Sequence, residues 1–274
     1  MTVRIVTVGG RSARVAVRPG DGTRTPLVVA GGIGGSLELL QPLVDALDPS
    51  IEVIRFDPPG VGGSPLPRAP YRFPGLARLL AGLLDALGYG TVDVLGFSWG
   101  GGVAQQLALC HPSRCRRLVL AATGTGMTMV PARPRVLVRM ATPRRYLDAE
   151  YLERIAPDVY GGTIRADPAR ARELLQGGTR LGPRLGYVYQ LAAGAGWSSL
   201  PFLPWIRQPT LVLAGDDDPL IPLVNARVMR RLIPNAELHV YGGGHLGLLT
   251  EARELAPIIE RFLVRADPVV EETA

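Results

Sequence analysis

The feature that most constrains the fold is the segment 92–101, an apolar, β-branched run that ends in Gly-x-Ser-x-Gly and passes directly into an amphipathic segment at 103–111. In a strand–turn–helix unit of this kind, the Ser98 hydroxyl stands on a tight turn above the sheet edge. Gly96 and Gly100 lie where the strand and helix backbones crowd together, so a Cβ at either position would clash. The pattern predicts a nucleophile elbow, a catalytic-serine turn, rather than a structural serine in a glycine-rich connection.

Composition places the chain among ordinary globular proteins. It has 274 residues, of which 47% are hydrophobic and 20% charged, enough for one large domain or a core with an insertion. The formal charge of +6 raises the question of nucleic acid. All 30 basic residues are arginine and they are scattered along the chain, whereas a nucleic-acid surface gathers them in a stripe. We therefore expect no nucleic-acid partner.

The chain start and the cysteines indicate a cytoplasmic protein. Residues 1–17 alternate apolar and polar side chains around Gly9 and Gly10, which predicts a β-hairpin and not a secretory signal. No stretch of eighteen uninterrupted apolar residues is present, so we expect no transmembrane segment. Cys110 and Cys115 lack CxxC spacing and are expected to be free thiols in a reducing compartment.

Strands and helices alternate on both sides of the elbow. This alternation, with continuously apolar strands, predicts an α/β fold whose mostly parallel central sheet carries helices on both faces. The expected strands are 27–30, 53–56, 92–97, 118–121, 210–214 and 236–241, and the expected helices are 37–47, 73–87, 103–111, 223–233 and 251–263.

The alternation stops between residues 123 and 208, where no convincing strand can be found. Prolines interrupt this stretch, and helical patterns cover 135–140, 149–155, 169–175 and 187–193. We interpret 123–208 as an inserted helical cap, or lid, on a core formed by 1–122 and 209–274. The polar end of the chain, 267–274, is expected to fray.

A serine nucleophile needs a base, and the chain has three histidines. His111 ends the elbow helix far from Ser98, and His239 lies within a predicted strand. His245 lies in a glycine-rich loop beyond the carboxyl end of a strand, the edge where catalytic groups gather in parallel sheets. We therefore predict His245 as the general base.

The acid that orients the histidine should lie between Ser98 and His245 in this kind of fold. The turn after strand 210–214 offers Asp216, Asp217 and Asp218. Neighbouring side chains diverge, so only one can face the imidazole. We choose Asp218, with Asp217 in reserve, and expect solvated turn positions for the others. The earlier Asp57 is assigned to holding its own Asp-Pro-Pro-Gly turn.

The oxyanion hole requires two backbone N–H donors. One is expected from Trp99, at the start of the elbow helix, where the amide has no intrahelical acceptor. The other is expected from Ile33, in the glycine-rich loop 31–35 that lets the backbone approach a substrate. This loop lacks the GxGxxG and Walker patterns of phosphate-binding loops, so a nucleotide is not predicted. No cofactor and no metal ion are expected.

The motifs around Ser98, Asp218 and His245, in that chain order, resemble the α/β-hydrolase superfamily. The stretches 52–64, 70–77 and 209–222, together with cap segments such as 143–146 and 196–199, look like intracellular depolymerases of medium-chain-length poly(3-hydroxyalkanoates). The resemblance spans nearly the whole chain. It implies that Ser98 is the nucleophile, Asp218 the orienting acid and His245 the general base of a serine esterase, with a polyester granule or a small apolar ester as partner.

Cap side chains that could line an apolar acyl tunnel are Met127, Met129, Tyr187, Tyr189, Trp197, Phe202 and Trp205, and Arg144 and Arg145 are expected on a solvated face. Several rival functions use the same site: a capped esterase or lactonase, a carbon–carbon hydrolase, or a cofactor-free haloperoxidase-like perhydrolase. A non-catalytic granule-binding member of the fold is a further alternative, against which the intact triad argues.

Overall fold

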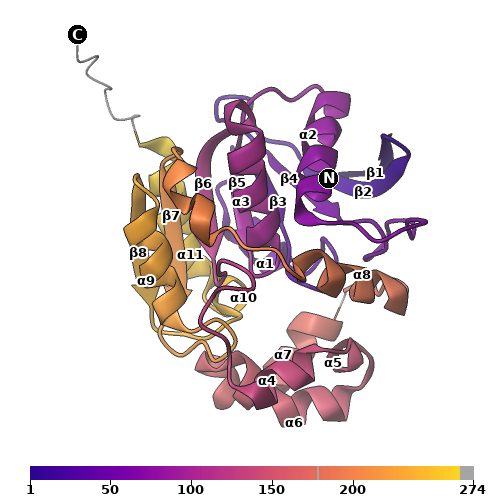
Figure 1. Cartoon of the computed structure of the whole chain (residues 1–274), viewed down its shortest axis with the longest axis vertical. Coiled ribbons are helices and arrows are strands. Elements are labelled where there is room, and N and C mark those ends of the chain that lie inside the picture. Colours follow the sequence, from indigo (N-terminus) through magenta and orange to yellow (C-terminus); the bar gives the residue numbers. More distant parts are fainter. Residues whose placement is uncertain (178, 266–274) are drawn as a thin grey trace.

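The computed structural model describes residues 1–177 and 179–265, so the predicted fraying of 267–274 lies outside the described residues. One twisted sheet of eight strands forms the centre, in the order β1-β2-β4-β3-β5-β6-β7-β8 (Figure 1). β1 and β2 form the predicted antiparallel hairpin, β2 pairs antiparallel with β4, and the remaining neighbours are parallel. The strands are β1 (Thr2–Val8), β2 (Arg11–Arg18), β3 (Leu27–Ala30), β4 (Val53–Asp57), β5 (Val92–Phe97), β6 (Cys115–Ala121), β7 (Thr210–Gly215) and β8 (Ala236–Tyr241).

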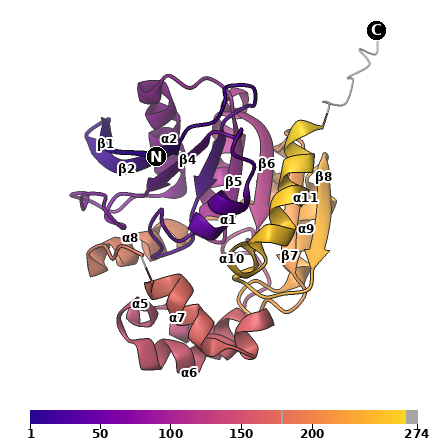
Figure 2. The same ribbon diagram turned by 180° about the vertical axis from the view of Figure 1, so that it is seen from behind.

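Helices cover both faces of the sheet, as the apolar strands require. In β3, Leu27 and Val29 contribute to one hydrophobic core and Val28 and Ala30 to the other, because successive side chains of a strand point to opposite faces. One face packs against α2 (Phe73–Leu87), α3 (Gly100–Cys110) and α9 (Leu223–Leu232). The other packs against α1 (Gln41–Ala46), α10 (Gly247–Thr250) and α11 (Ala252–Val264), which lie toward the viewer in Figure 2.

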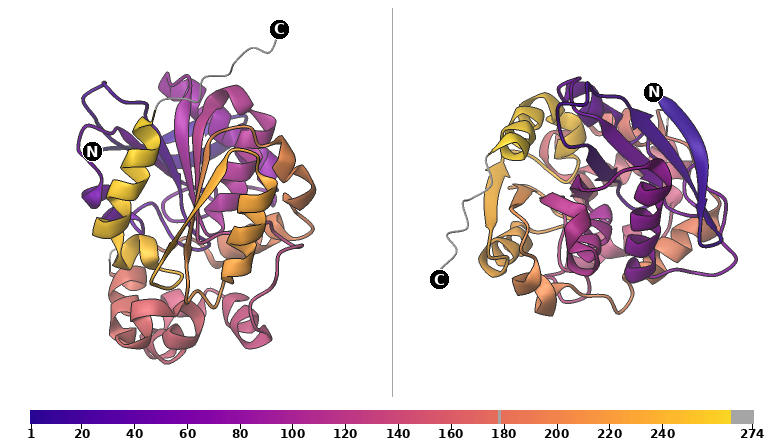
Figure 3. Two further views of the ribbon diagram at one scale, coloured as in Figure 1. Left: turned by 90° about the vertical axis from the view of Figure 1, so that its left-hand side faces the viewer. Right: turned by 90° about the horizontal axis from the view of Figure 1, so that it is seen from above.

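The segment between β6 and β7 forms a separate layer of helices. All of them except the last short turn, Leu200–Trp205, gather at one end of the sheet, below it in Figure 1 and in the edge-on view of Figure 3; that turn packs beside α9. The helices of the segment are α4 (Pro134–Met140), α5 (Arg144–Leu147), α6 (Ala149–Tyr160), α7 (Pro168–Gln176) and α8 (Arg184–Gly194), with short 3₁₀ turns η2 (Gly162–Arg165) and η3 (Leu200–Trp205); a further one, η1 (Pro112–Arg114), precedes β6. None of the helices in the described part of the chain is both long and apolar enough to cross a membrane.

The boundaries of α1 and β6 differ from those predicted. Helix α1 begins at Gln41 and not at residue 37, because residues 37–40 form turns with three-residue backbone hydrogen bonds, Leu39 to Ser36 and Gln41 to Glu38. The Leu37 amide donates to the Asp57 carboxylate at 2.6 Å. Pro42, without an amide hydrogen, fits the first turn of a helix, where no acceptor is needed. Strand β6 begins at Cys115 instead of 118, and α5 has no counterpart among the predicted helices.

Asp57 holds its turn, as the sequence predicts. Its carboxylate is fully buried and accepts the amide hydrogens of Leu37 and, at 2.8 Å, Gly63, while Arg14 Nε lies 3.0 Å away. Burial raises the pKa of Asp57 to about 6, although the two amides and Arg14 oppose the shift. The carboxylate therefore ties the β4 turn to the loop before α1.

This raised pKa predicts a pH-dependent contribution to stability. An unfolded aspartate titrates near 3.9. The folded state therefore binds the proton more tightly, and the contribution of Asp57 is largest below pH 4 and is lost as the pH rises through about 6. We expect the wild type to lose stability relative to Asp57→Asn as the pH rises from 4 to 7, measured as the free energy of unfolding in urea. A difference that is constant over this range would contradict the assignment.

Candidate active site

Ser98 lies on the turn between β5 and α3, with a backbone φ of 53°, in the left-handed region that L residues rarely adopt. Its amide donates to the Ala121 carbonyl at 2.9 Å, which anchors the turn to β6. A Cβ on Gly96 would lie 2.6 Å from Gly101 Cα, and one on Gly100 would collide with the Ala30 carbonyl. The crowding expected of the elbow is therefore present, and the tight turn lifts the serine side chain above the sheet.

His245 follows β8 and reaches the serine. Its Nε2 lies 2.9 Å from Ser98 Oγ, and its Nδ1 lies 2.8 Å from Asp218 Oδ2. Its amide donates to the Tyr160 carbonyl at 2.7 Å, and the rings of Phe97 and Tyr160 flank the imidazole. Only 3% of His245 is exposed, so the imidazole is held in a nearly dry site.

The neighbouring aspartates diverge. Asp218 Oδ1 accepts the amides of Leu220 and Ile221, each at 2.8 Å, which leaves Oδ2 directed at the imidazole. Asp217 instead forms a bidentate pair with Arg165, at 2.7 and 2.8 Å, and the arginine lowers the pKa of Asp217. Asp216 accepts the Gly243 amide. The structure therefore brings Asp218 to the histidine and not the reserve choice.

The other two histidines lie elsewhere. His111 is the C-terminal cap residue of α3, at the opposite end of that helix from Ser98, and His239 lies within β8.

The glycine-rich loop after β3 lies against the serine. A methyl group on Gly32 would lie 3.6 Å from Ser98 Cβ, and Ile33 borders the same cavity as Ser98 and Trp99. Among the described residues, the amides of Ile33 and Trp99 have no hydrogen-bond acceptor. Two unused donors beside the hydroxyl are what a tetrahedral oxyanion needs.

An apolar cavity of about 190 Å³ opens beside Ser98, between the sheet and the segment that connects β6 to β7. Of the residues predicted to form a tunnel, Met129 and Trp197 line it. Other lining residues, which the sequence reasoning missed, are Phe73, Met140, Leu220 and Ile221.

The remaining tunnel candidates lie away from this cavity. Met127, Phe202 and Trp205 are exposed. The Tyr189 ring packs edge-on against Tyr71. Tyr187 is buried, and its hydroxyl donates to the Met140 carbonyl.

Arg145 is not on a solvated face, contrary to expectation. It is 1% exposed and its guanidinium donates to Tyr187 Oη and to the Ile33 carbonyl. Its neighbour Arg144 is on the surface, paired with Asp148 at 2.9 Å. Both arginines lie on α5, a helix of only four residues that was not evident from the sequence, and as consecutive helical residues they point in different directions.

Fold and site together define the class of protein. The family model described as the alpha/beta hydrolase fold matches residues 25–252, so the chain belongs to the α/β hydrolase family. It is 55% identical over 260 residues, 95% of this chain and 92% of the relative, to a poly(3-hydroxyalkanoate) depolymerase of Ectopseudomonas oleovorans. It is 34% identical to a 2-hydroxymuconate semialdehyde hydrolase of Pseudomonas putida, over 68% of this chain and 67% of the relative.

Solved structures agree on the fold. The enol-lactonase from Burkholderia xenovorans LB400 superimposes with a TM-score of 0.81 at 23% identity, covering 96% of this chain and 100% of that chain. A hydrolase from Pseudomonas aeruginosa PA01 gives 0.79 at 25% identity, over 96% of this chain and 98% of that one.

Proposed function

We propose that this protein hydrolyses the ester bonds of medium-chain-length poly(3-hydroxyalkanoates) through an acyl-enzyme on Ser98, with His245 as base and Asp218 as orienting acid. The observation that carries the proposal is the hydrogen-bonded series Ser98–His245–Asp218 beside an apolar cavity. The similarity to a poly(3-hydroxyalkanoate) depolymerase over nearly the whole chain supports the choice of substrate.

The reaction proceeds in two stages. His245 Nε2 accepts the Ser98 proton as Oγ attacks the ester carbonyl carbon, and the resulting oxyanion accepts hydrogen bonds from the Ile33 and Trp99 amides. His245 then gives the proton to the departing 3-hydroxyl oxygen, which leaves an acyl-enzyme. Water, activated by the same imidazole, releases the 3-hydroxy acid or oligomer and restores the serine.

Electrostatics favour the charged transition state. Asp218, which accepts two backbone amides, is held to stabilise the imidazolium that forms on His245. Each oxyanion donor contributes about 3 kcal/mol, because it is fixed before the charge develops. The mechanism requires no cofactor.

The cavity favours a medium-length alkyl chain. The side chain of such a polyester monomer continues from the carbon that bears the ester oxygen, so it must be placed within a few ångströms of Ser98. An apolar cavity of about 190 Å³, larger than a methyl group needs, gives it a dry site.

Gly194 offers a way to shorten this cavity. It lies at the end of α8 and lines the cavity, and the nearest atom to a Cβ placed on it is Phe73 Cε2 at 4.0 Å. We expect Gly194→Leu to lower the ratio of kcat/KM for p-nitrophenyl octanoate to that for the butanoate by about tenfold or more, since pocket discrimination per methylene reaches this size. Gly194→Ala, which adds one methyl group, is the control and should keep most of the preference. An unchanged ratio in Gly194→Leu would show that the acyl chain lies elsewhere.

We also propose that residues 123–208 form a cap domain on a core of 1–122 and 209–274, and that the enzyme works on granules in the cytoplasm. Exposed apolar side chains on α4 and α8 of the proposed cap support a granule-facing surface, since apolar side chains leave water favourably on contact with an apolar polyester. They include Leu137, Val138, Leu185, Val188 and Leu191, with Val138 73% exposed.

The direct test is the clearing of turbid suspensions of medium-chain and short-chain polyester, with Ser98→Ala as control. The proposal expects the medium-chain suspension to clear and 3-hydroxy acids or oligomers to appear. If p-nitrophenyl esters are hydrolysed while neither suspension clears, the protein is an esterase for small substrates.

A further inference from the structure

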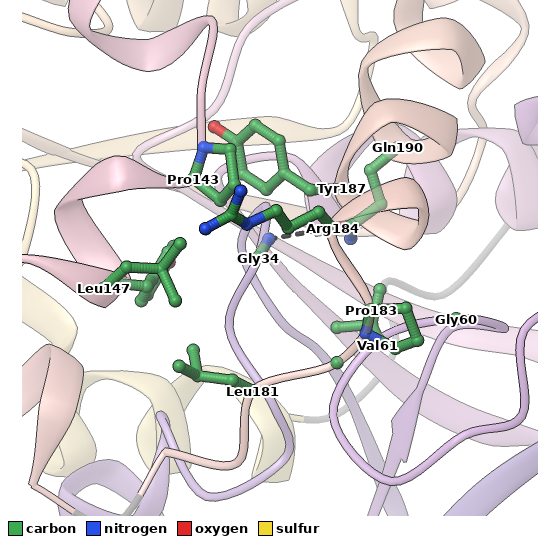
Figure 4. A pocket seen from close by; sticks show the side chains of 12 residues that line it. Gly34, Gly60, Val61, Pro143, Leu147, Leu181, Pro183, Arg184, Tyr187 and Gln190 are labelled. Carbon is green, nitrogen blue, oxygen red and sulfur yellow. Dashed lines mark hydrogen bonds between the residues drawn. The ribbon is translucent and has the colours of Figure 1, made fainter.

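The proposed cap holds one peptide group of the glycine-rich loop 31–35, the one between Ile33 and Gly34, at both its carbonyl and its amide. The carbonyl of Ile33 accepts hydrogen bonds from Tyr146 Oη at 2.8 Å and Arg145 Nη2 at 3.1 Å. The amide of the same peptide, on Gly34, donates to Gln190 Oε1 at 2.7 Å (Figure 4). All three side chains come from the helices between β6 and β7. The plane of the 33–34 peptide is therefore set by the cap and not by the sheet.

This peptide adjoins the oxyanion donor. The Ile33 amide belongs to the preceding peptide, and the two planes are joined only through the Ile33 Cα. With the 33–34 peptide fixed by the cap and Gly32 packed on Ser98 and Phe97, the direction of the Ile33 N–H is determined. An oxyanion donor is effective only when it is aimed in advance at the site where charge develops.

Gln190 also reaches the second donor. Its backbone carbonyl accepts the indole N–H of Trp99 at 2.9 Å. One residue of α8 thus contacts the residues that carry both proposed donors, one through its side chain and one through its backbone. Gln190 is 1% exposed, so water does not compete for these bonds.

Arg145 is a buried cation with an unusual environment. Among the described residues it has no carboxylate partner; it bonds to Tyr187 Oη at 2.7 Å and stacks over the rings of Tyr146 and Tyr187. Burying an unpaired charge is costly, and an apolar residue would fill the same space more cheaply. The guanidinium is therefore better explained by what it holds, the Ile33 carbonyl.

We propose that Gln190, Arg145 and Tyr146 are positioning residues through which the cap aligns the oxyanion hole. The inference rests on the proposed acyl-enzyme function. With the cap seated, the Ile33 and Trp99 amides are aligned for the tetrahedral intermediate. When the cap side chains are lost, substrate still binds but its transition state is stabilised less.

The main test is Gln190→Met, which keeps size but cannot accept the Gly34 amide. We expect kcat for p-nitrophenyl octanoate to fall at least tenfold with KM changed less than threefold, because a small misalignment of catalytic groups costs about this much. The affinity for a trifluoromethyl ketone, which forms a tetrahedral oxyanion on serine, should fall by the same factor as kcat/KM.

The matched control is Gln208→Met. Gln208 is also buried, and its amide bonds to the Ala108 carbonyl, away from the site. We expect its kcat to stay within twofold of wild type. If Gln190→Met does not fold, Tyr146→Phe removes a single oxygen and should lower kcat and ketone affinity together.

Two outcomes would overturn the proposal: kcat unchanged in the folded Gln190→Met or Tyr146→Phe protein, or a loss in KM alone with ketone affinity preserved. Because the assays use a soluble ester, they separate this proposal from the choice of polymer. If the wild type hydrolyses the ester but clears no polyester, the polymer is not the substrate. The role of the positioning residues can still be measured on the ester.

Discussion

Ser98→Ala will reduce kcat for ester hydrolysis by a factor on the order of 10⁶, the loss seen when the nucleophile of a serine triad is removed. In the proposed mechanism the hydroxyl is the group that becomes covalently bonded, and its oxygen lies 2.9 Å from His245 Nε2. Alanine keeps the Cβ, so the φ of 53° and the packing on Gly32 are retained. Activity is measured on p-nitrophenyl octanoate, and thermal unfolding should show an unchanged midpoint.

A double variant tests whether Ser98 and His245 act in one mechanism, because their losses of activity then do not add. His245→Ala alone should lose about as much activity as Ser98→Ala, and the double variant should lose little more, because the two groups act as one unit. Additive losses would mean that the residues serve separate steps. A Ser98→Ala protein that keeps more than a hundredth of wild-type activity would place the nucleophile elsewhere.

Regular segments of the fold could be predicted from local pattern. Helix α2 was expected at 73–87 and is found there, because its leucines repeat at helical spacing and Gly88 ends it in a left-handed conformation, φ 83°. Strands β3 and β8 also match. The start of α1 could not be predicted in this way, because residues 37–40 continue the apolar pattern of the helix but form turns whose backbone hydrogen bonds span three residues, Leu39 to Ser36 and Gln41 to Glu38.

The residues of the site also differ in whether their local sequence predicts them. Ser98 and His245 lie in segments whose local sequence indicates a turn beyond a strand, and both emerge as candidates. Arg145 and Gln190 do not, because their contacts join residues 112 and 156 positions apart. The helical pattern gave no signal for Gln190 either, because Leu185, Val188 and Leu191 repeat at a spacing of three and indicate a buried face, yet they are exposed and the face with Gln190 is buried.

Asp218→Asn will lower kcat by about 10⁴-fold while leaving KM little changed, the effect found when a triad aspartate is replaced by asparagine. The Asp218 carboxylate accepts from His245 Nδ1 and so keeps Nε2 free to take the serine proton. An asparagine amide can donate to Nδ1 instead, which favours the tautomer with the proton on Nε2. The imidazole then has no lone pair to offer Ser98.

The adjacent Asp217 provides a matched control for charge and for the turn itself. Its carboxylate is half-exposed and pairs with Arg165, so Asp217→Asn removes the same charge one residue away without touching the imidazole. Loss of a surface ion pair costs about 0–1 kcal/mol of stability, and kcat should stay within twofold of wild type. If Asp217→Asn abolishes activity and Asp218→Asn does not, the orienting role belongs to the other carboxylate. If both variants are fully active, His245 acts without an aspartate partner.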